Sequence, residues 1–88
     1  MAWGIMIIGM GNRYYQWTIS DEKMYHSINE TLSSKNGQRR YGMKLIGSVD
    51  NITDEKIDGV SDAIDSLVER LNSGKPVDVK KELEDSCQ

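Results

Sequence analysis

The run "AWGIMIIGM", residues 2–10, constrains the fold of this 88-residue chain more than any other stretch. Every residue in it is apolar or glycine, and none carries a charge. It is much shorter than the roughly 20 residues that a membrane-spanning helix needs. Because successive side chains of a strand point to opposite faces, a strand made of these residues is apolar on both. The sequence therefore predicts a strand that needs cover on both of its faces.

Gly11 and Asn12 separate this run from a second predicted strand, residues 13–19. Glycine and asparagine tolerate the positive φ that a two-residue hairpin turn requires. A turn at these residues makes Ile8 face Tyr15, and a slip of one residue would exchange the two faces of the hairpin. In the predicted register, one face carries Met6, Ile8, Met10, Tyr15, Trp17 and Ile19, and the other carries Trp3, Ile5, Ile7, Tyr14, Gln16 and Thr18.

The next segment predicts a helix, a turn and a strand. Residues 21–34 form the helix, because Ser20 or Asp21 can accept hydrogen bonds from the free amides at its start and apolar residues recur at every fourth position. The polar stretch "SSKNGQRR" predicts a turn, and residues 41–49 predict a third strand. One side of that strand carries Tyr41, Met43, Leu45 and Val49.

Residues 54–72 show the clearest helical pattern of the chain. Thr53 can cap this helix, and Gly74 and Pro76 are typical of residues that follow a helix end. Residues 77–86 predict either a short terminal helix or an extended tail. The apolar stripe of the long helix consists of Ile57, Val60, Ile64, Leu67, Val68 and Leu71.

The order of these elements, ββαβα, predicts a small α+β domain. We expect a three-stranded, mainly antiparallel sheet with two helices on one face, in two layers. Residues 1–76 form this domain, and residues 77–88 add the short terminal helix or tail. Two helices on one face leave the side of Trp3, Ile5 and Ile7 open. A second copy of the chain is the cover that we expect, which would make the protein a homo-oligomer, and the terminal segment is the alternative.

Several classes of site are disfavoured by the residue types present. The chain has one cysteine, Cys87, and one histidine, His26, so it predicts neither an internal disulfide nor a metal site. The sequence does not show the combination of nucleophile, base and orienting group that nucleophilic catalysis needs. The segment "GMGNRY" lacks the third glycine of a dinucleotide-binding loop. The apolar run has no basic residues before it and no cleavage site. We therefore expect a non-enzymatic cytoplasmic protein without a cofactor, a metal or a membrane partner.

Charge is divided unevenly along the chain, whose net charge is −3. Residues 1–49 carry six bases and three acids, whereas residues 50–88 carry five bases and eleven acids. An asymmetry of this kind indicates a charged partner. The net acidity argues against binding of long nucleic acid, because phosphate neutralisation supplies much of that affinity.

The predicted helix at 54–72 carries acids nearly opposite its apolar stripe. No acid in this helix has a lysine or arginine three or four residues away, although such pairs stabilise helices, and like charges at this spacing each cost about 0.2–0.5 kcal/mol. A solvated face is one interpretation, and a docking surface for a basic protein partner is the other. We call these residues the acidic stripe: Asp54, Asp58, Asp62, Asp65 and Glu69.

Two segments in the first half of the chain place arginine beside tyrosine. Arginine binds phosphate through a planar fork of donors, and aromatic rings stack on nucleobases. Glycines at both ends of "GQRRYG" predict a mobile loop that a phosphate can reach. The candidate ligand-binding residues are Arg13, Tyr14, Arg39, Arg40 and Tyr41.

Two functions follow from these features, and both are binding functions. The first is a small interaction protein, a regulator or inhibitor, that binds a basic protein partner through the acidic stripe. The alternative is a binder of a small phosphorylated ligand or nucleotide through the arginine–tyrosine segments.

Overall fold

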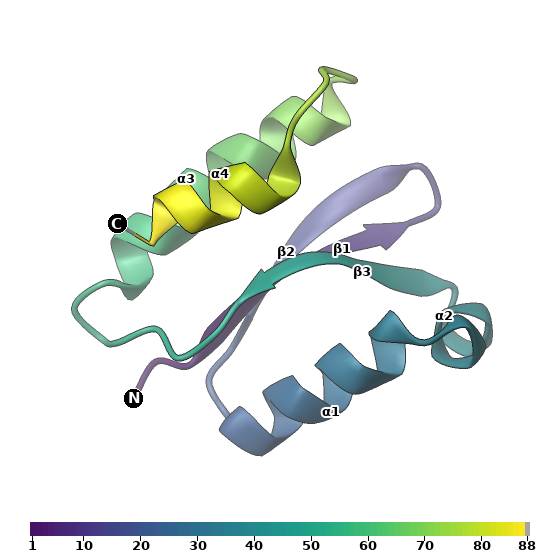
Figure 1. Ribbon diagram of the computed structural model, residues 1–88, viewed down its shortest axis with the longest axis horizontal. Helices are drawn as coiled ribbons and strands as arrows, with labels where there is room; N and C mark the ends of the chain where they lie inside the picture. Colours follow the sequence, from purple (N-terminus) through teal and green to yellow (C-terminus); the bar gives the residue numbers. More distant parts are fainter. Residues whose placement is uncertain (88) are drawn as a thin grey trace.

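A three-stranded antiparallel sheet lies at the centre of the computed structural model, which describes residues 1–87 (Figure 1). Its strands are β1 (Gly4–Met10), β2 (Arg13–Ile19) and β3 (Met43–Val49). β1 is the middle strand and pairs antiparallel with both neighbours. The apolar run thus occupies the central strand, and the predicted α+β class with a three-stranded antiparallel sheet is confirmed.

The hairpin has the register that the sequence predicts. Ile8 pairs with Tyr15, and Met6 pairs with Trp17. Gly11 supplies the positive φ of the turn, at 63°. This matches a type II′ hairpin, in which glycine takes the first central position.

Two helices lie on one side of the sheet. They are α1 (Glu22–Ser33) and α2 (Lys35–Tyr41), which follows α1 and leads into the start of β3 (Figure 1). Asp21 caps α1 by accepting a hydrogen bond from the Met24 N–H at 2.9 Å. The core between this layer and the sheet consists of Met6, Ile8, Ile19, Tyr25 and Leu32.

Two further helices, α3 (Ile57–Asn72) and α4 (Val79–Ser86), cover the opposite face (Figure 1). The core on this side consists of Ile5, Ile7, Val49, Ile52, Val60, Ile64, Leu67 and Leu83. The domain therefore has three layers, and the expected arrangement with both long helices on one face was wrong. The physical reason is that β1 is apolar on both faces, so each face takes a helical layer of its own.

The side chains that we expected to mediate self-association are covered within the chain. Ile5 and Ile7 are fully buried in the core beneath α3 and α4. Trp3 precedes β1 and turns to the other face, where its ring centre lies 4.8 Å from that of Tyr25. The three residues share no exposed face, so the open surface that motivated the self-association prediction does not exist.

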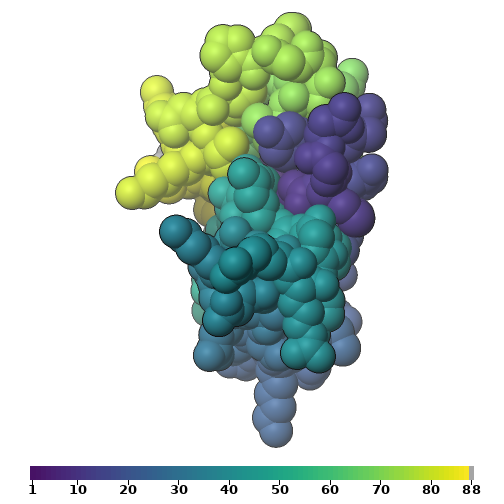
Figure 2. Space-filling view, turned by 90° about the vertical axis from the view of Figure 1, so that its right-hand side faces the viewer, coloured from purple at the N-terminus to yellow at the C-terminus, as the bar shows by residue number. Residues whose placement is uncertain are grey.

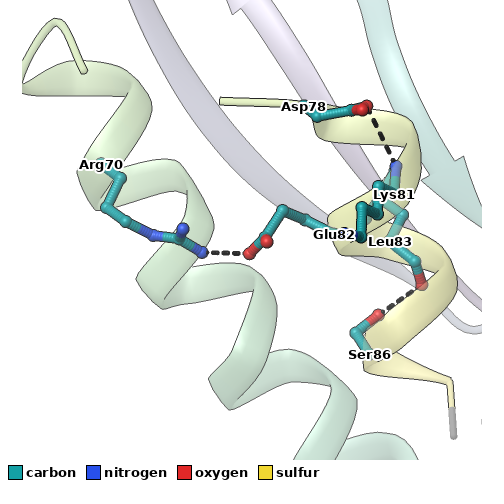
Figure 3. A network of polar contacts seen from close by, with 6 residues as sticks. All are labelled: Arg70, Asp78, Lys81, Glu82, Leu83 and Ser86. Atoms are coloured by element: carbon teal, nitrogen blue, oxygen red, sulfur yellow. Dashed lines mark hydrogen bonds and ion pairs between the residues drawn. The ribbon is translucent and has the colours of Figure 1, made fainter. Parts of the chain in front are cut away.

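α4 is the short terminal helix that the sequence offered as one of two outcomes. Asp78 caps its start, and Arg70 of α3 donates a hydrogen bond to Glu82 in an ion pair between the two helices (Figure 3). Leu83 packs over Gly47 of β3, where an added Cβ would lie 2.6 Å from the Leu83 Cδ1 atom. α4 is therefore part of the core and not a loose tail.

β3 contains a bulge that the alternating pattern did not predict. Its pairing with β1 skips Ile46. An extra residue moves the side chains that follow it to the opposite face. Met43 and Leu45 consequently pack on the α1 side, whereas Val49 packs beneath α3 and α4.

The stretch that we expected to be a mobile loop is helix α2. Ser34 caps it by accepting a hydrogen bond from the Gly37 N–H at 3.1 Å, and Gly42, with φ 67°, ends it. Arg39 and Arg40 are neighbours on this helix, so their side chains leave it in directions about 100° apart. Only one of the two can point toward the hairpin.

Candidate functional site

A hollow of about 550 Å³ opens where the hairpin turn, α2 and the start of β3 meet. Figure 2 looks onto this end of the molecule, with the purple hairpin beside the teal α2 and β3. Four of the side chains that line the hollow are cationic and none is acidic, so we call it the basic hollow. The four cations are Arg13, Lys35, Arg39 and Lys44.

Three elements bring these cations together. Arg13 is the first residue of β2, directly after the turn, and Lys44 is the second residue of β3. Arg13 lies opposite Met10 of β1, and Lys44 lies opposite Gly9, so the two cations leave opposite faces of the sheet and the hollow extends around its end. Gly9 has no side chain beside Lys44. Lys35 and Arg39 are four residues apart on α2, which places them on the same side of that helix.

The floor of the hollow depends on Gly9. An added Cβ at this position would lie 3.1 Å from the Cδ1 atom of Ile46, the bulge residue, and 3.6 Å from the Cγ atom of Lys44. A side chain here would press on the bulge and occupy part of the hollow. Glycine at this position therefore keeps the hollow open, and it is not required for the geometry of the hairpin turn.

The cations of the basic hollow have no anionic partner among residues 1–87. All four side chains are exposed, and none takes part in a salt bridge of the described chain. Arg39 donates a hydrogen bond to the neutral Oδ1 atom of Asn36 at 3.1 Å. The positive charge is thus available to an anion, and charge-assisted hydrogen bonds to phosphate are among the strong ones.

Tyr14 lines the hollow and is held in place by α3. Asn72, the last residue of α3, accepts a hydrogen bond from the Tyr14 N–H at 2.8 Å and donates one to the Tyr14 carbonyl oxygen at 3.0 Å. Outward-facing backbone groups of an edge strand otherwise lack a partner. This pair of hydrogen bonds closes the outer edge of β2 beside the hollow and ties the site to the α3 layer.

The structure brings together three of the five candidate ligand-binding residues. Arg13, Tyr14 and Arg39 all line the basic hollow. Arg40 and Tyr41 lie outside it and border a separate depression on the other side of α2. There the Arg40 guanidinium carbon is 5.6 Å from the centre of the Tyr41 ring.

Two members of the site, Lys35 and Lys44, were missed in the sequence. The available signal was the spacing of Lys35 and Arg39, which puts two cations on one side of a helix. Because the segment "SSKNGQRR" reads as a turn, that spacing had no structural meaning at the sequence level. Lys44 carried no signal, since its proximity to Arg13 depends on the sheet order β2-β1-β3.

Four members of the acidic stripe lie on α3, away from the basic hollow, and Asp54 precedes the helix. Asp58, Asp62 and Glu69 are exposed and take part in no salt bridge of the described residues. Asp65 accepts a hydrogen bond from the side chain of Gln16 on β2. The Oδ1 atom of Asp54 lies 3.5 Å from the N-terminal amine. Three of the five carboxylates are therefore available to a partner.

The titratable groups do not cluster as metal ligands in the part of the chain that is described. No group of three or more His, Cys, Asp or Glu side chains there could hold a metal ion, and none of the described helices is long and apolar enough to span a membrane. Burial raises the pKa of Tyr25, against the opposing effect of its hydrogen bond with Ser48. Tyr25 belongs to the core beneath α1 and does not line the basic hollow.

Comparison with known proteins adds no relative. Neither a protein-family model, nor a curated protein, nor a solved structure matches the chain. Function is therefore inferred from the chemistry of the basic hollow and the acidic stripe.

Proposed function

We propose that the protein is a non-enzymatic binding protein that holds a small phosphorylated ligand in the basic hollow. The observation that carries the proposal is the convergence of four cations, from three separate elements, around one hollow without a counter-charge. Guanidinium groups bind phosphate oxygens through two parallel hydrogen bonds, and lysine adds a compact charge. The backbone positions of Arg13 and Lys44 are fixed, because β2 and β3 each pair with the central strand β1.

The size and charge of the molecule support a small ligand. The volume of about 550 Å³ lies within the range of about 300–1,000 Å³ that is usual for small-molecule sites. The net charge of −3 and the acidic stripe oppose the long phosphate backbone of a duplex. A small polyanion contacts only the basic hollow and stays away from the acidic stripe.

The neighbouring arginines of α2 provide a matched test. Titration calorimetry with pyrophosphate should show binding to the unmodified protein, and Arg39→Ala should weaken it by about tenfold or more, since hydrogen bonds to charged groups contribute about 1.5–3 kcal/mol. Arg40→Ala is the control, because it removes the same charge from the same helix outside the hollow. Equal losses in the two variants, or no binding of any phosphorylated compound at millimolar concentration, would contradict the proposal.

A second candidate function is docking of a basic protein partner on the acidic stripe, as a regulator or inhibitor. It is favoured by the exposure of Asp58, Asp62 and Glu69 without cations beside them. Complementary charge of this kind raises association rates and gives specificity. The stripe and the basic hollow lie on different elements, so a partner on α3 leaves the hollow accessible.

A further inference from the structure

Aromatic side chains remain exposed on the α1 side of the sheet. Tyr15 of β2 is 39% exposed, Tyr41 at the end of α2 is 51% exposed, and Trp17 of β2 is half-buried. This side is less completely covered than the other, because α1 packs against β3 more than against β2, whereas α3 lies over β2 on the opposite face. We call Tyr15, Trp17 and Tyr41 the aromatic patch.

The aromatic patch adjoins the basic hollow. Tyr15 lies two residues from Arg13 on the same face of β2, which corresponds to about 7 Å along a strand. Trp17 and Tyr41 border a smaller hollow of about 230 Å³, and Met43 of β3 lines both this hollow and the basic one. Arg13 and Tyr15 thus share one face of β2, and Met43 connects the basic hollow to the hollow beside Trp17 and Tyr41.

We propose that the ligand of the basic hollow is a nucleotide, whose base packs on the aromatic patch while its phosphates lie among the four cations. This inference rests on the proposed phosphate-binding function and specifies its ligand class. Stacking on aromatic side chains is tolerant of base identity, because every nucleobase has a π-face. Among residues 1–87, Tyr41 lies beneath the Arg40 guanidinium, whereas Tyr15 and Trp17 pair with no aromatic ring or cation.

The number of cations favours a nucleotide with more than one phosphate. A single phosphate monoester carries a charge of about −1.5 to −2 at neutral pH, whereas the hollow presents four positive side chains. A nucleoside diphosphate, or a short single strand with several phosphates, balances that charge better. A phosphotyrosine peptide, which combines one phosphate with one ring, balances only half of it.

Trp17 reports directly on the base. In a Trp3→Phe background it is the remaining tryptophan, since the chain has two, and Trp3 packs on Tyr25 and His26 near the start of β1. Titration with ADP and CDP should quench the Trp17 emission, whereas pyrophosphate and ribose 5-phosphate should not. The nucleoside diphosphates should bind about tenfold more tightly than pyrophosphate, because stacking adds to phosphate binding.

Tyr15→Ser should weaken binding of the nucleoside diphosphates by about fivefold to tenfold and leave pyrophosphate binding unchanged. Thr18→Ala, on the same strand but the other face, is the control and should change neither. A short oligonucleotide that binds at least as tightly as ADP would support the inference and would indicate that the bound nucleotide is part of an oligonucleotide chain.

Equal affinities for pyrophosphate and ADP would overturn the nucleotide inference and leave phosphate binding intact. A phosphotyrosine peptide that binds more tightly than any nucleotide would also overturn it. Absence of binding by pyrophosphate and all nucleotides would overturn both this inference and the proposed function.

Discussion

Glycines in two helices of this protein occupy opposite environments. Gly37 of α2 is buried, and an added Cβ would lie 1.9 Å from the carbonyl oxygen of Thr31 in α1. Gly59 of α3 is exposed, and nothing lies within 4 Å of its added Cβ. Gly37 therefore permits the backbone of α2 to touch α1, which holds Lys35 and Arg39 over the hollow. Gly59 has no packing role of this kind.

Alanine substitution should consequently change the free energy of unfolding in opposite directions at these two positions. Gly37→Ala should lower it by about 1–3 kcal/mol, because α2 must move away from α1. Gly59→Ala should raise it by about 0.5–1 kcal/mol, because alanine loses less backbone freedom in a helix. Urea denaturation followed by circular dichroism measures both. A Gly37→Ala protein as stable as the unmodified one would contradict the close contact of the two helices.

Tyr25 makes the stability depend on pH in the alkaline range. Burial raises its pKa in the folded protein above the ordinary tyrosine value of 10.0, so the unfolded chain loses the phenolic proton first. The contribution of Tyr25 is therefore fully present below about pH 10 and is lost as the pH rises through the folded pKa. Tyr25→Phe should be less stable at neutral pH by about 1 kcal/mol, from lost hydrogen bonds. Urea titrations at rising pH should show this difference shrinking above pH ~10, and a constant difference would contradict the assignment.

At the scale of the elements, the parts that follow from local rules could be predicted and those that depend on tertiary packing could not. The hairpin register follows from Gly11 and Asn12, and the long helix follows from its apolar stripe. α2 contains Gly37 and polar residues, and its helix is stabilised by packing on α1. The bulge at Ile46 breaks the alternation that the prediction of β3 assumed. Arg13, Tyr14 and Arg39 could therefore be identified as candidate ligand-binding residues from the sequence, but their proximity to Lys35 and Lys44 could not be predicted.

The acidic stripe makes a prediction for α3 as an element. Asp62 and Glu69 lie beyond its first turn, where the helix dipole does not favour negative charge. Changing both to lysine should raise the free energy of unfolding by about 0.5 kcal/mol, because like-charge repulsion is relieved. If the stripe docks a basic partner, the unmodified chain should recover a protein from an extract of the source cells at low salt and lose it at high salt. The variant with both lysines should not recover that protein.

Asp85→Lys on α4 is the control for that experiment, because it reverses an exposed charge outside the stripe. The control should recover the same salt-sensitive protein as the unmodified chain. Recovery of the same proteins by all three forms would leave the stripe as a solvated face.

At the scale of the whole molecule, the flat shape separates the two charged surfaces. The domain measures 35 × 33 × 16 Å, and its thin dimension reflects a sheet of three strands. The basic hollow lies at the ends of these strands, and the acidic stripe lies on the outer side of the α3 layer. A chain this small gains only a marginal core from a single layer pair, and the second helical layer adds the buried surface that we had expected an oligomer to supply.

The three-layer fold changes the effect on folding that we expect from a charged substitution in β1. Ile5 is fully buried within one chain, so Ile5→Lys places an ammonium group in the core beneath α3 and α4. An unpaired buried charge costs several kcal/mol, which is comparable to the total stability of about 5–15 kcal/mol of a small domain. We therefore expect Ile5→Lys to be unfolded by far-UV circular dichroism. Met24→Lys, at a position that is 54% exposed, is the matched control and should remain folded. Light scattering that found Ile5→Lys folded and smaller than the unmodified protein would instead show that this residue lies between copies of the chain.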